Sequence, residues 1–188
     1  MINKYGLISI LFLLLISCAE EDNLPSGSEL ISNTNLSEYP DSVFPWTSYK
    51  LGGTEVGVSK EVFMTGNRSL FIENLDSLNS GQATWTQTYS GPMPAPGSIV
   101  ELTAFLKGVD IKNFTEGRVG IRFRVYPDSD RNGSSGEILS LQGDFDWTLL
   151  RTTLDGFPTN AEFIIVDLNF PSSTYGKMYF DEISLRVK

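Results

Sequence analysis

The sequence predicts an all-β chain: an antiparallel β-sandwich, or jelly roll, preceded by a signal peptide and a short linker. Short segments in which apolar and polar residues alternate recur along the chain, and clusters of Gly, Pro, Asn and Asp separate them. No stretch keeps the 3.6-residue apolar period of an amphipathic helix. Seven or more strands at this spacing are typical of two stacked antiparallel sheets.

Residues 1–17 are predicted to be a signal peptide. Lys4 gives a short basic start, and Gly6–Ile16 is a mostly apolar run. This run is too short to cross a membrane as a helix, which needs about 20 residues. It has the length of the apolar region of a secretion signal, and the small residue Ser17 ends it.

The single cysteine, Cys18, follows immediately. The segment Leu15-Ile16-Ser17-Cys18 resembles the bacterial lipobox, in which the cysteine is acylated and becomes the new N-terminus. The resemblance implies a lipoprotein anchored through Cys18, in the outer membrane; the alternative is an ordinary signal peptide with an incidental cysteine. Residues 19–22 include three acids, which resemble a surface-export signal but also suit a solvated tether. Surface exposure therefore stays open.

The remaining chain is predicted to form a flexible tether over residues 18–33 and one domain over residues 34–188.

The composition excludes several functions. Without Lys4, the chain has 13 basic and 23 acidic residues, a net charge of about −10. Nucleic acid is excluded as a partner because its phosphates need a basic face. The chain has no histidine, which excludes Ser-His-Asp and Cys-His catalysis and most zinc sites.

The predicted strands differ in how clearly the sequence marks them. Val119–Tyr126 alternates most regularly, and Ala83–Tyr89 alternates Thr with larger side chains. The segments Gly91–Gly97 and Asp128–Gly136 are rich in turn residues and are expected to be loops. In chain order, the strands are expected at Ser69–Glu73, Ala83–Tyr89, Ile99–Lys107, Val119–Tyr126, Trp147–Leu154, Glu162–Phe170 and Lys177–Val187.

Alternation also places several polar and aromatic residues on common strand faces, where they could bind a sugar. Aromatic rings stack on the apolar C–H faces of sugars, and Arg, Asn, Asp and Gln bind hydroxyl groups. Arg122 and Arg124 could also grip a carboxylate such as a uronic acid, or belong to a solvated face with Arg–Glu pairs. Trp85 could equally be a core residue. The candidate glycan-binding residues are Trp85, Gln87, Arg122, Arg124, Tyr126, Asp167 and Asn169.

The chain resembles jelly-roll carbohydrate-binding modules of the cellulose- and xylan-binding type, which are related to galactose-binding-like domains. The resemblance covers roughly residues 30–187. Its segments occur in the family's order: Asn35-Leu36-Ser37-Glu38, Trp46, Gly66-Asn67-Arg68-Ser69-Leu70, Trp85-Thr86-Gln87, Pro96-Gly97, Leu102–Lys107, Asp146-Trp147 and Gly176–Ile183.

This resemblance implies a glycan cleft on the concave sheet. Trp85 and Gln87 match one cleft strand, although the family often has Glu in place of Gln. The arginine strand Val119–Tyr126 matches a second, and Asp167 with Asn169 a third. The fold hosts several binding roles and some structural ones, so the resemblance implies the fold more strongly than the ligand.

Two parts of the sequence could hold calcium. The resemblance implies a structural calcium held by Glu38 and Asp181, which would join the two ends of the domain; the alternative for Asp181 is a capping hydrogen bond. Residues 128–133 match the first half of an EF-hand loop. Leu139 stands where the bidentate Glu is needed, so a plain acidic hairpin loop is the preferred interpretation.

The function predicted from the sequence is glycan binding by a membrane-anchored lipoprotein. The alternative is a structural or adhesin-like component that binds partner proteins at the cell surface and has no glycan affinity. An enzyme is not predicted, because glycoside hydrolysis needs paired carboxylates about 5–10 Å apart across a cleft. The nearest pair, Asp144 and Asp146, lies beside a predicted turn.

Overall fold

The computed structural model describes residues 24–75, 81–113, 119–127, 133–139, 142–172 and 174–188. The predicted signal peptide, Cys18 and the loop 128–132 lie outside these residues. The described part of the chain forms ten strands and no helix. Among the same residues, no helix is long and apolar enough to cross a membrane.

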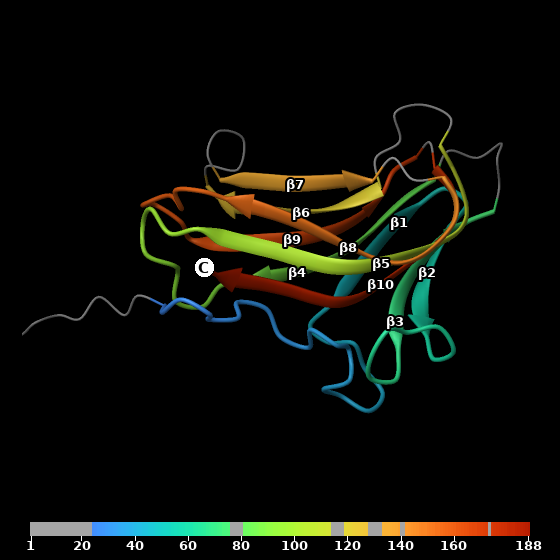
Figure 1. The fold of residues 1–188 in the computed structure, drawn as a ribbon, viewed down its shortest axis with the longest axis horizontal. Coiled ribbons are helices and arrows are strands. Elements are labelled where there is room, and N and C mark those ends of the chain that lie inside the picture. Colours follow the sequence, from blue (N-terminus) through green and yellow to red (C-terminus); the bar gives the residue numbers. More distant parts are fainter. Residues whose placement is uncertain (1–23, 76–80, 114–118, 128–132, 140–141, 173) are drawn as a thin grey trace, which may run out of the picture.

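The ten strands form two antiparallel five-stranded sheets that pack face to face (Figure 1), which confirms the predicted sandwich. One sheet has the order β1-β4-β9-β6-β7 and the other β2-β3-β10-β5-β8. The strands are β1 Thr47–Leu51, β2 Thr54–Ser59, β3 Ser69–Asn74, β4 Gln82–Tyr89, β5 Val100–Asn113, β6 Val119–Tyr126, β7 Ser134–Leu139, β8 Gly143–Leu154, β9 Phe163–Phe170 and β10 Thr174–Val187.

The core lies between the two sheets and is built from the apolar face of each central strand. In β9 the alternate residues Ile164, Val166 and Leu168 are fully buried. Residues 121, 123 and 125 of β6 and residues 102, 104 and 106 of β5 are buried in the same way. Each fully buried large apolar side chain contributes about 1.5–3 kcal/mol, so these rows fix which face of each strand turns to solvent.

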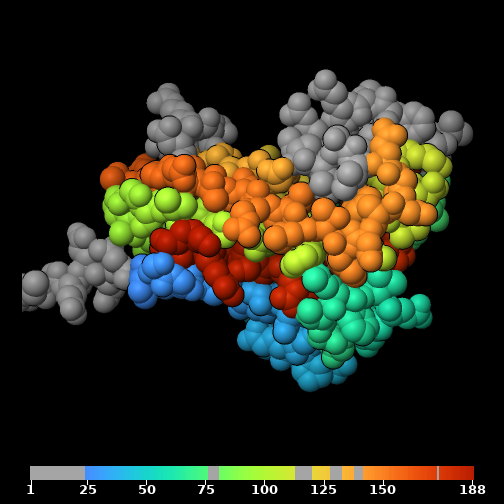
Figure 2. Space-filling view, in the orientation of Figure 1, coloured from blue at the N-terminus to red at the C-terminus, as the bar shows by residue number. Residues whose placement is uncertain are grey.

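Residues 24–33, predicted as part of the tether, are packed against the domain. Leu30 and Ile31 are both 4% exposed, and the Leu30 backbone N–H donates to Leu185 O at 2.8 Å. The Glu29 carboxylate accepts from the Leu185 N–H and the Arg186 Nε. Figure 2 shows this segment, in blue, lying along the C-terminal strand, in dark red. The domain therefore begins before residue 34, which corrects the predicted boundary.

Candidate functional site

A groove of about 510 Å³ lies on the outer face of the β1-β4-β9-β6-β7 sheet. All five strands contribute to it. The residues around it are Tyr49, Gln82, Ala83, Thr84, Gly120, Ile121, Arg122, Gly136, Glu137, Asn169, Phe170 and Pro171.

Strand register aligns the outward-facing residues of this sheet in rows that cross the strands. The first row joins Tyr49 to Thr84, Thr84 to Asn169, and Asn169 to Gly120. The next row contains Thr47, Thr86, Asp167, Arg122 and Gly136. Small residues in both rows, including two glycines, leave the space that the groove occupies.

Tyr49 supplies the aromatic surface of the groove. It lies on the edge strand β1 and is 53% exposed, so its ring can be reached from solvent. On the neighbouring strand, Thr84 Oγ1 already donates to Leu168 O at 3.0 Å. Asn169, next in the row, has no side-chain hydrogen bond to any described residue, so its amide can contact a ligand. Tyr49 was not among the predicted site residues, because residues 47–51 were not expected to form a strand.

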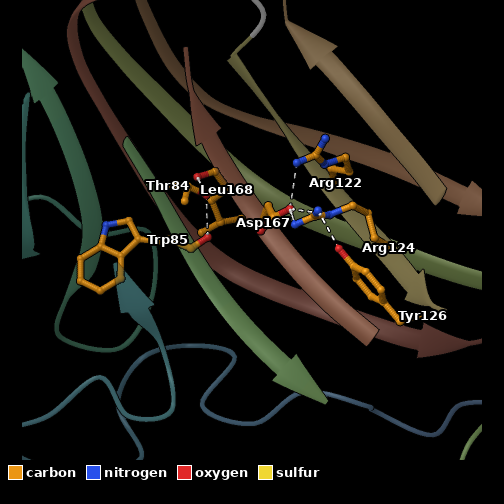
Figure 3. A network of polar contacts seen from close by, with 7 residues as sticks. All are labelled: Thr84, Trp85, Arg122, Arg124, Tyr126, Asp167 and Leu168. Atoms are coloured by element: carbon orange, nitrogen blue, oxygen red, sulfur yellow. Dashed lines mark hydrogen bonds and ion pairs between the residues drawn. The ribbon is translucent and has the colours of Figure 1, made fainter. Parts of the chain in front are cut away.

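A network of two arginines around one carboxylate lies beside this row (Figure 3). Arg122 Nη2 donates to Asp167 Oδ2 at 3.0 Å, and Arg124 donates to the same oxygen through Nε at 3.2 Å and Nη2 at 2.9 Å. Arg124 Nη1 also donates to the Tyr126 hydroxyl at 2.8 Å. The Tyr126 ring stacks on Phe163 with centroids 4.7 Å apart and an interplanar angle of 9°.

The structure thus gathers five of the seven predicted glycan-binding residues on one solvent-facing sheet surface. Arg122 and Asn169 border the groove itself. Asp167 is buried beneath Arg122, with its side chain 5% exposed. Arg124 and Tyr126 lie one and two rows further along β6 and hold the network in place.

Trp85 and Gln87 do not belong to this surface, which corrects their predicted place in the site. Trp85 is 6% exposed, and its Nε1 donates to Phe71 O, on the opposite sheet, at 3.1 Å. In Figure 3 its indole points away from the arginine network. Gln87 is 3% exposed and exchanges two hydrogen bonds with the Ser32 backbone, at 2.9 and 3.1 Å. The core interpretation of Trp85 is therefore the right one, and the threonines of β4 face solvent instead.

Asp181, predicted with Glu38 to hold calcium, accepts three backbone hydrogen bonds. Its Oδ2 accepts from the N–H of Met64 at 2.7 Å and of Thr65 at 3.2 Å, and Oδ1 from that of Glu182 at 2.8 Å. Burial raises the pKa of the Asp181 carboxyl above its ordinary value, and these N–H groups oppose that rise. Glu38 is exposed, and no cluster of three or more Asp, Glu, Cys or His is found among the described residues. Calcium binding at this pair stays a prediction.

Several solved structures have the same β-sandwich architecture as this chain. No family model and no curated protein matches the chain. The CBM22-1 xylan-binding domain of Paenibacillus barcinonensis Xyn10C superposes with a TM-score of 0.53 at 15% identity, over 87% of this chain and 97% of that domain. The chain therefore shares its jelly-roll fold with this xylan-binding domain. This confirms the resemblance at the level of the fold.

Other solved structures with this fold are named as enzymes. A Stig cyclase from Fischerella sp. TAU has a TM-score of 0.59 at 14% identity, over 86% of this chain and 98% of that one. The enzymatically active domain of bacteriophage CBA120 tailspike protein 4 reaches 0.61 at 18% identity, over 85% of this chain. The chain spans 21% of that tailspike structure. At these identities the likeness concerns the fold alone.

Proposed function

We propose that this domain binds a polysaccharide or other glycan in the groove on the outer face of the β1-β4-β9-β6-β7 sheet, without catalysing a reaction. The observation that carries the proposal is the row in which Tyr49 and Asn169 face the same groove. A half-exposed ring can stack on the C–H face of a sugar, and a free amide can bind its hydroxyl groups. The fold of a xylan-binding domain supports this proposal.

The groove crosses all five strands, which suits a chain-like ligand. It has one aromatic wall, at Tyr49, and one cationic wall, at Arg122. Asp167, the acidic residue of this surface, is already engaged by two arginines. A pair of free carboxylates, which glycoside hydrolysis requires, is therefore not found among the described outward-facing residues of this sheet.

The same proposal places the domain at the cell surface or outer membrane, anchored by a lipid on Cys18. The support is the lipobox-like segment at residues 15–18, which ends an apolar run. A lipid on Cys18 would hold the domain at the membrane, since each buried CH₂ contributes about 0.8 kcal/mol.

A protein-binding, adhesin-like function is the second candidate. It is favoured by exposed apolar residues away from the groove: Phe44 is 63% exposed and packs edge-on against Tyr39, with ring centroids 5.9 Å apart. Exposed apolar side chains that form a contiguous patch can mark a site where a partner protein binds. This candidate predicts that Phe44→Ser abolishes capture of a partner protein and that the wild-type protein binds no polysaccharide.

Affinity gel electrophoresis against a panel of soluble polysaccharides tests the proposed function. The panel contains β-glucan, xylan, mannan, glucuronoxylan and polygalacturonate. Retardation by at least one polymer, beyond that of a non-binding control protein, is expected. If the protein migrates through every gel like the control, glycan binding is wrong and the protein-binding candidate takes its place.

A further inference from the structure

The groove wall formed by β6 and β9 carries an excess of positive charge in an acidic protein. The whole chain has a net charge of −9, yet two guanidinium groups converge on one carboxylate here. Arg122 and Arg124 lie 3.0 and 2.9 Å from Asp167 Oδ2. One positive charge therefore remains unbalanced within the network.

The acidic residues near the groove do not cancel this charge. Glu137 borders the groove, but it pairs with Ile121, whose side chain is buried in the core. Glu137 is exposed on the edge strand β7, and alternation directs its side chain away from the face that carries Arg122. Glu55, near β1, is already paired with Lys50 at 2.8 Å. Among the described outward-facing residues of the sheet, Asp167 is the one acid.

Arg124 and Arg122 use their donors differently. Arg124 engages Nε, Nη1 and Nη2, with Asp167 and the Tyr126 hydroxyl as acceptors, so it serves to position the carboxylate. Arg122 donates a single hydrogen bond, from Nη2. Its Nη1 has no partner among the described residues. Because 44% of the side chain is exposed, a ligand can reach this guanidinium.

The shape of the Arg122 site limits how a ligand can approach. Its Nε is buried and has no partner among the described residues, so a ligand reaches the guanidinium through its Nη end. Arg122 and Asn169 both line the groove. A planar anion fits the end of a guanidinium, and charge-assisted hydrogen bonds are about twice as strong as neutral ones.

We propose that the groove selects glycans that carry uronic acids, with the sugar carboxylate bound by Arg122 while the ring of Tyr49 and the amide of Asn169 hold the chain. This inference rests on the proposed function and names its ligand class. Asp167 and Arg124 position Arg122 without touching the ligand. A neutral sugar would leave the Nη1 donors to hydroxyl groups, which are weaker acceptors than a carboxylate.

The test compares one polymer in two forms. The purified protein is titrated with polygalacturonate and with glucuronoxylan, and with the same polymers after chemical reduction of their carboxyl groups to alcohols. We expect about tenfold tighter binding of the acidic forms, and loss of most of this preference when salt is raised from about 0.02 to about 0.5 M. Polyglutamate, a polyanion without sugars, is expected to bind weakly.

Variants of Arg122 show whether this residue makes the selection. Arg122→Gln is expected to reduce the ratio of acidic to reduced polymer from about ten to about one, and Arg122→Lys to retain part of it. Unchanged melting temperatures show that both variants are folded. The ratio for Arg151→Gln, which removes an exposed guanidinium on the other sheet, should remain near ten.

The outcomes separate this inference from the proposed function. If acidic and reduced polymers bind equally, or if Arg122→Gln retains the full ratio, uronic-acid selection is overturned while glycan binding stands. Polyglutamate binding as tight as that of polygalacturonate would also overturn it, because plain charge attraction would then suffice. If no polysaccharide of the wider panel binds, the proposed function fails and this inference fails with it.

Discussion

Trp85 of β4 joins the two sheets by donating its indole N–H to the backbone oxygen of Phe71 on β3, at 3.1 Å. The bond spans the sandwich, since β4 and β3 belong to different sheets. The indole is 6% exposed, so it acts on the fold and not on a ligand in the groove.

Substitution of Trp85 should therefore affect stability before affinity. Trp85→Ala is expected to lower the free energy of unfolding by about 3–5 kcal/mol through the cavity it leaves, and Trp85→Phe by less. Urea denaturation measures both. Trp85→Phe, where folded, should keep wild-type glycan affinity. If Trp85→Phe is stable but has no glycan affinity, the indole contacts the ligand and this account of Trp85 is wrong.

Tyr49 is predicted to be the aromatic contact of the groove. Tyr49→Ala should weaken glycan binding about tenfold, because a stacked ring is lost, while unfolding changes by about 0.5 kcal/mol or less at this exposed position. Tyr39→Ala is the matched control, since Tyr39 is also exposed but lies outside the groove. Isothermal titration of both variants decides the point. Equal losses of affinity, or none, would contradict the role of Tyr49.

Substitution of Asp167 should lower both the stability of the domain and its affinity for glycan. Asp167→Asn removes the charge that holds two arginines, and we expect a loss of about 1–3 kcal/mol together with weaker affinity as Arg122 is released. Glu101→Gln is the control, because Glu101 also bears two cations, Arg151 and Lys188, each at 2.9 Å, on the other sheet. It should lose stability without loss of affinity. Denaturation and titration of both variants provide the comparison, and an Asp167→Asn variant with full affinity would contradict the link.

Asp181 distinguishes a backbone cap from a calcium ligand. Because its carboxylate accepts three backbone N–H groups, Asp181→Ala should cost about 2 kcal/mol or more. The cap account predicts the same cost in EDTA as in millimolar Ca²⁺, measured by thermal unfolding. A cost that appears only with Ca²⁺, and that Glu38→Gln reproduces, would instead establish the predicted calcium site.

The sequence predicted the central strands well because their apolar rows are regular. Residues 119–126 and 163–170 alternate clearly, and both form strands. The edge strand β1 was missed because all five of its residues are exposed and give no apolar period. Residues 134–139 were assigned partly to a loop because Ser and Gly dominate their start.

The site was predicted in part for a related reason. Alternation shows which residues share a face, but it does not show which face is buried when both are mixed. In β4 one face carries Trp85 and Gln87 and the other carries threonines. Trp85 packs in the core, and the amide of Gln87 forms hydrogen bonds with the Ser32 backbone. Where one face was purely apolar, as in β6, the outward placement of Arg122 and Arg124 was predicted correctly.

The central claim, that the groove is the binding site, is tested most directly by filling it. A Cβ at Gly136 would lie 3.5 Å from Ile121 O and 3.6 Å from Arg122 Cβ, which are ordinary contacts, so Gly136→Tyr should fold normally and place its ring in the groove. Titration of this variant with the best polysaccharide of the panel should show at least a tenfold loss of affinity at an unchanged melting temperature. Wild-type affinity in the folded variant would contradict the account.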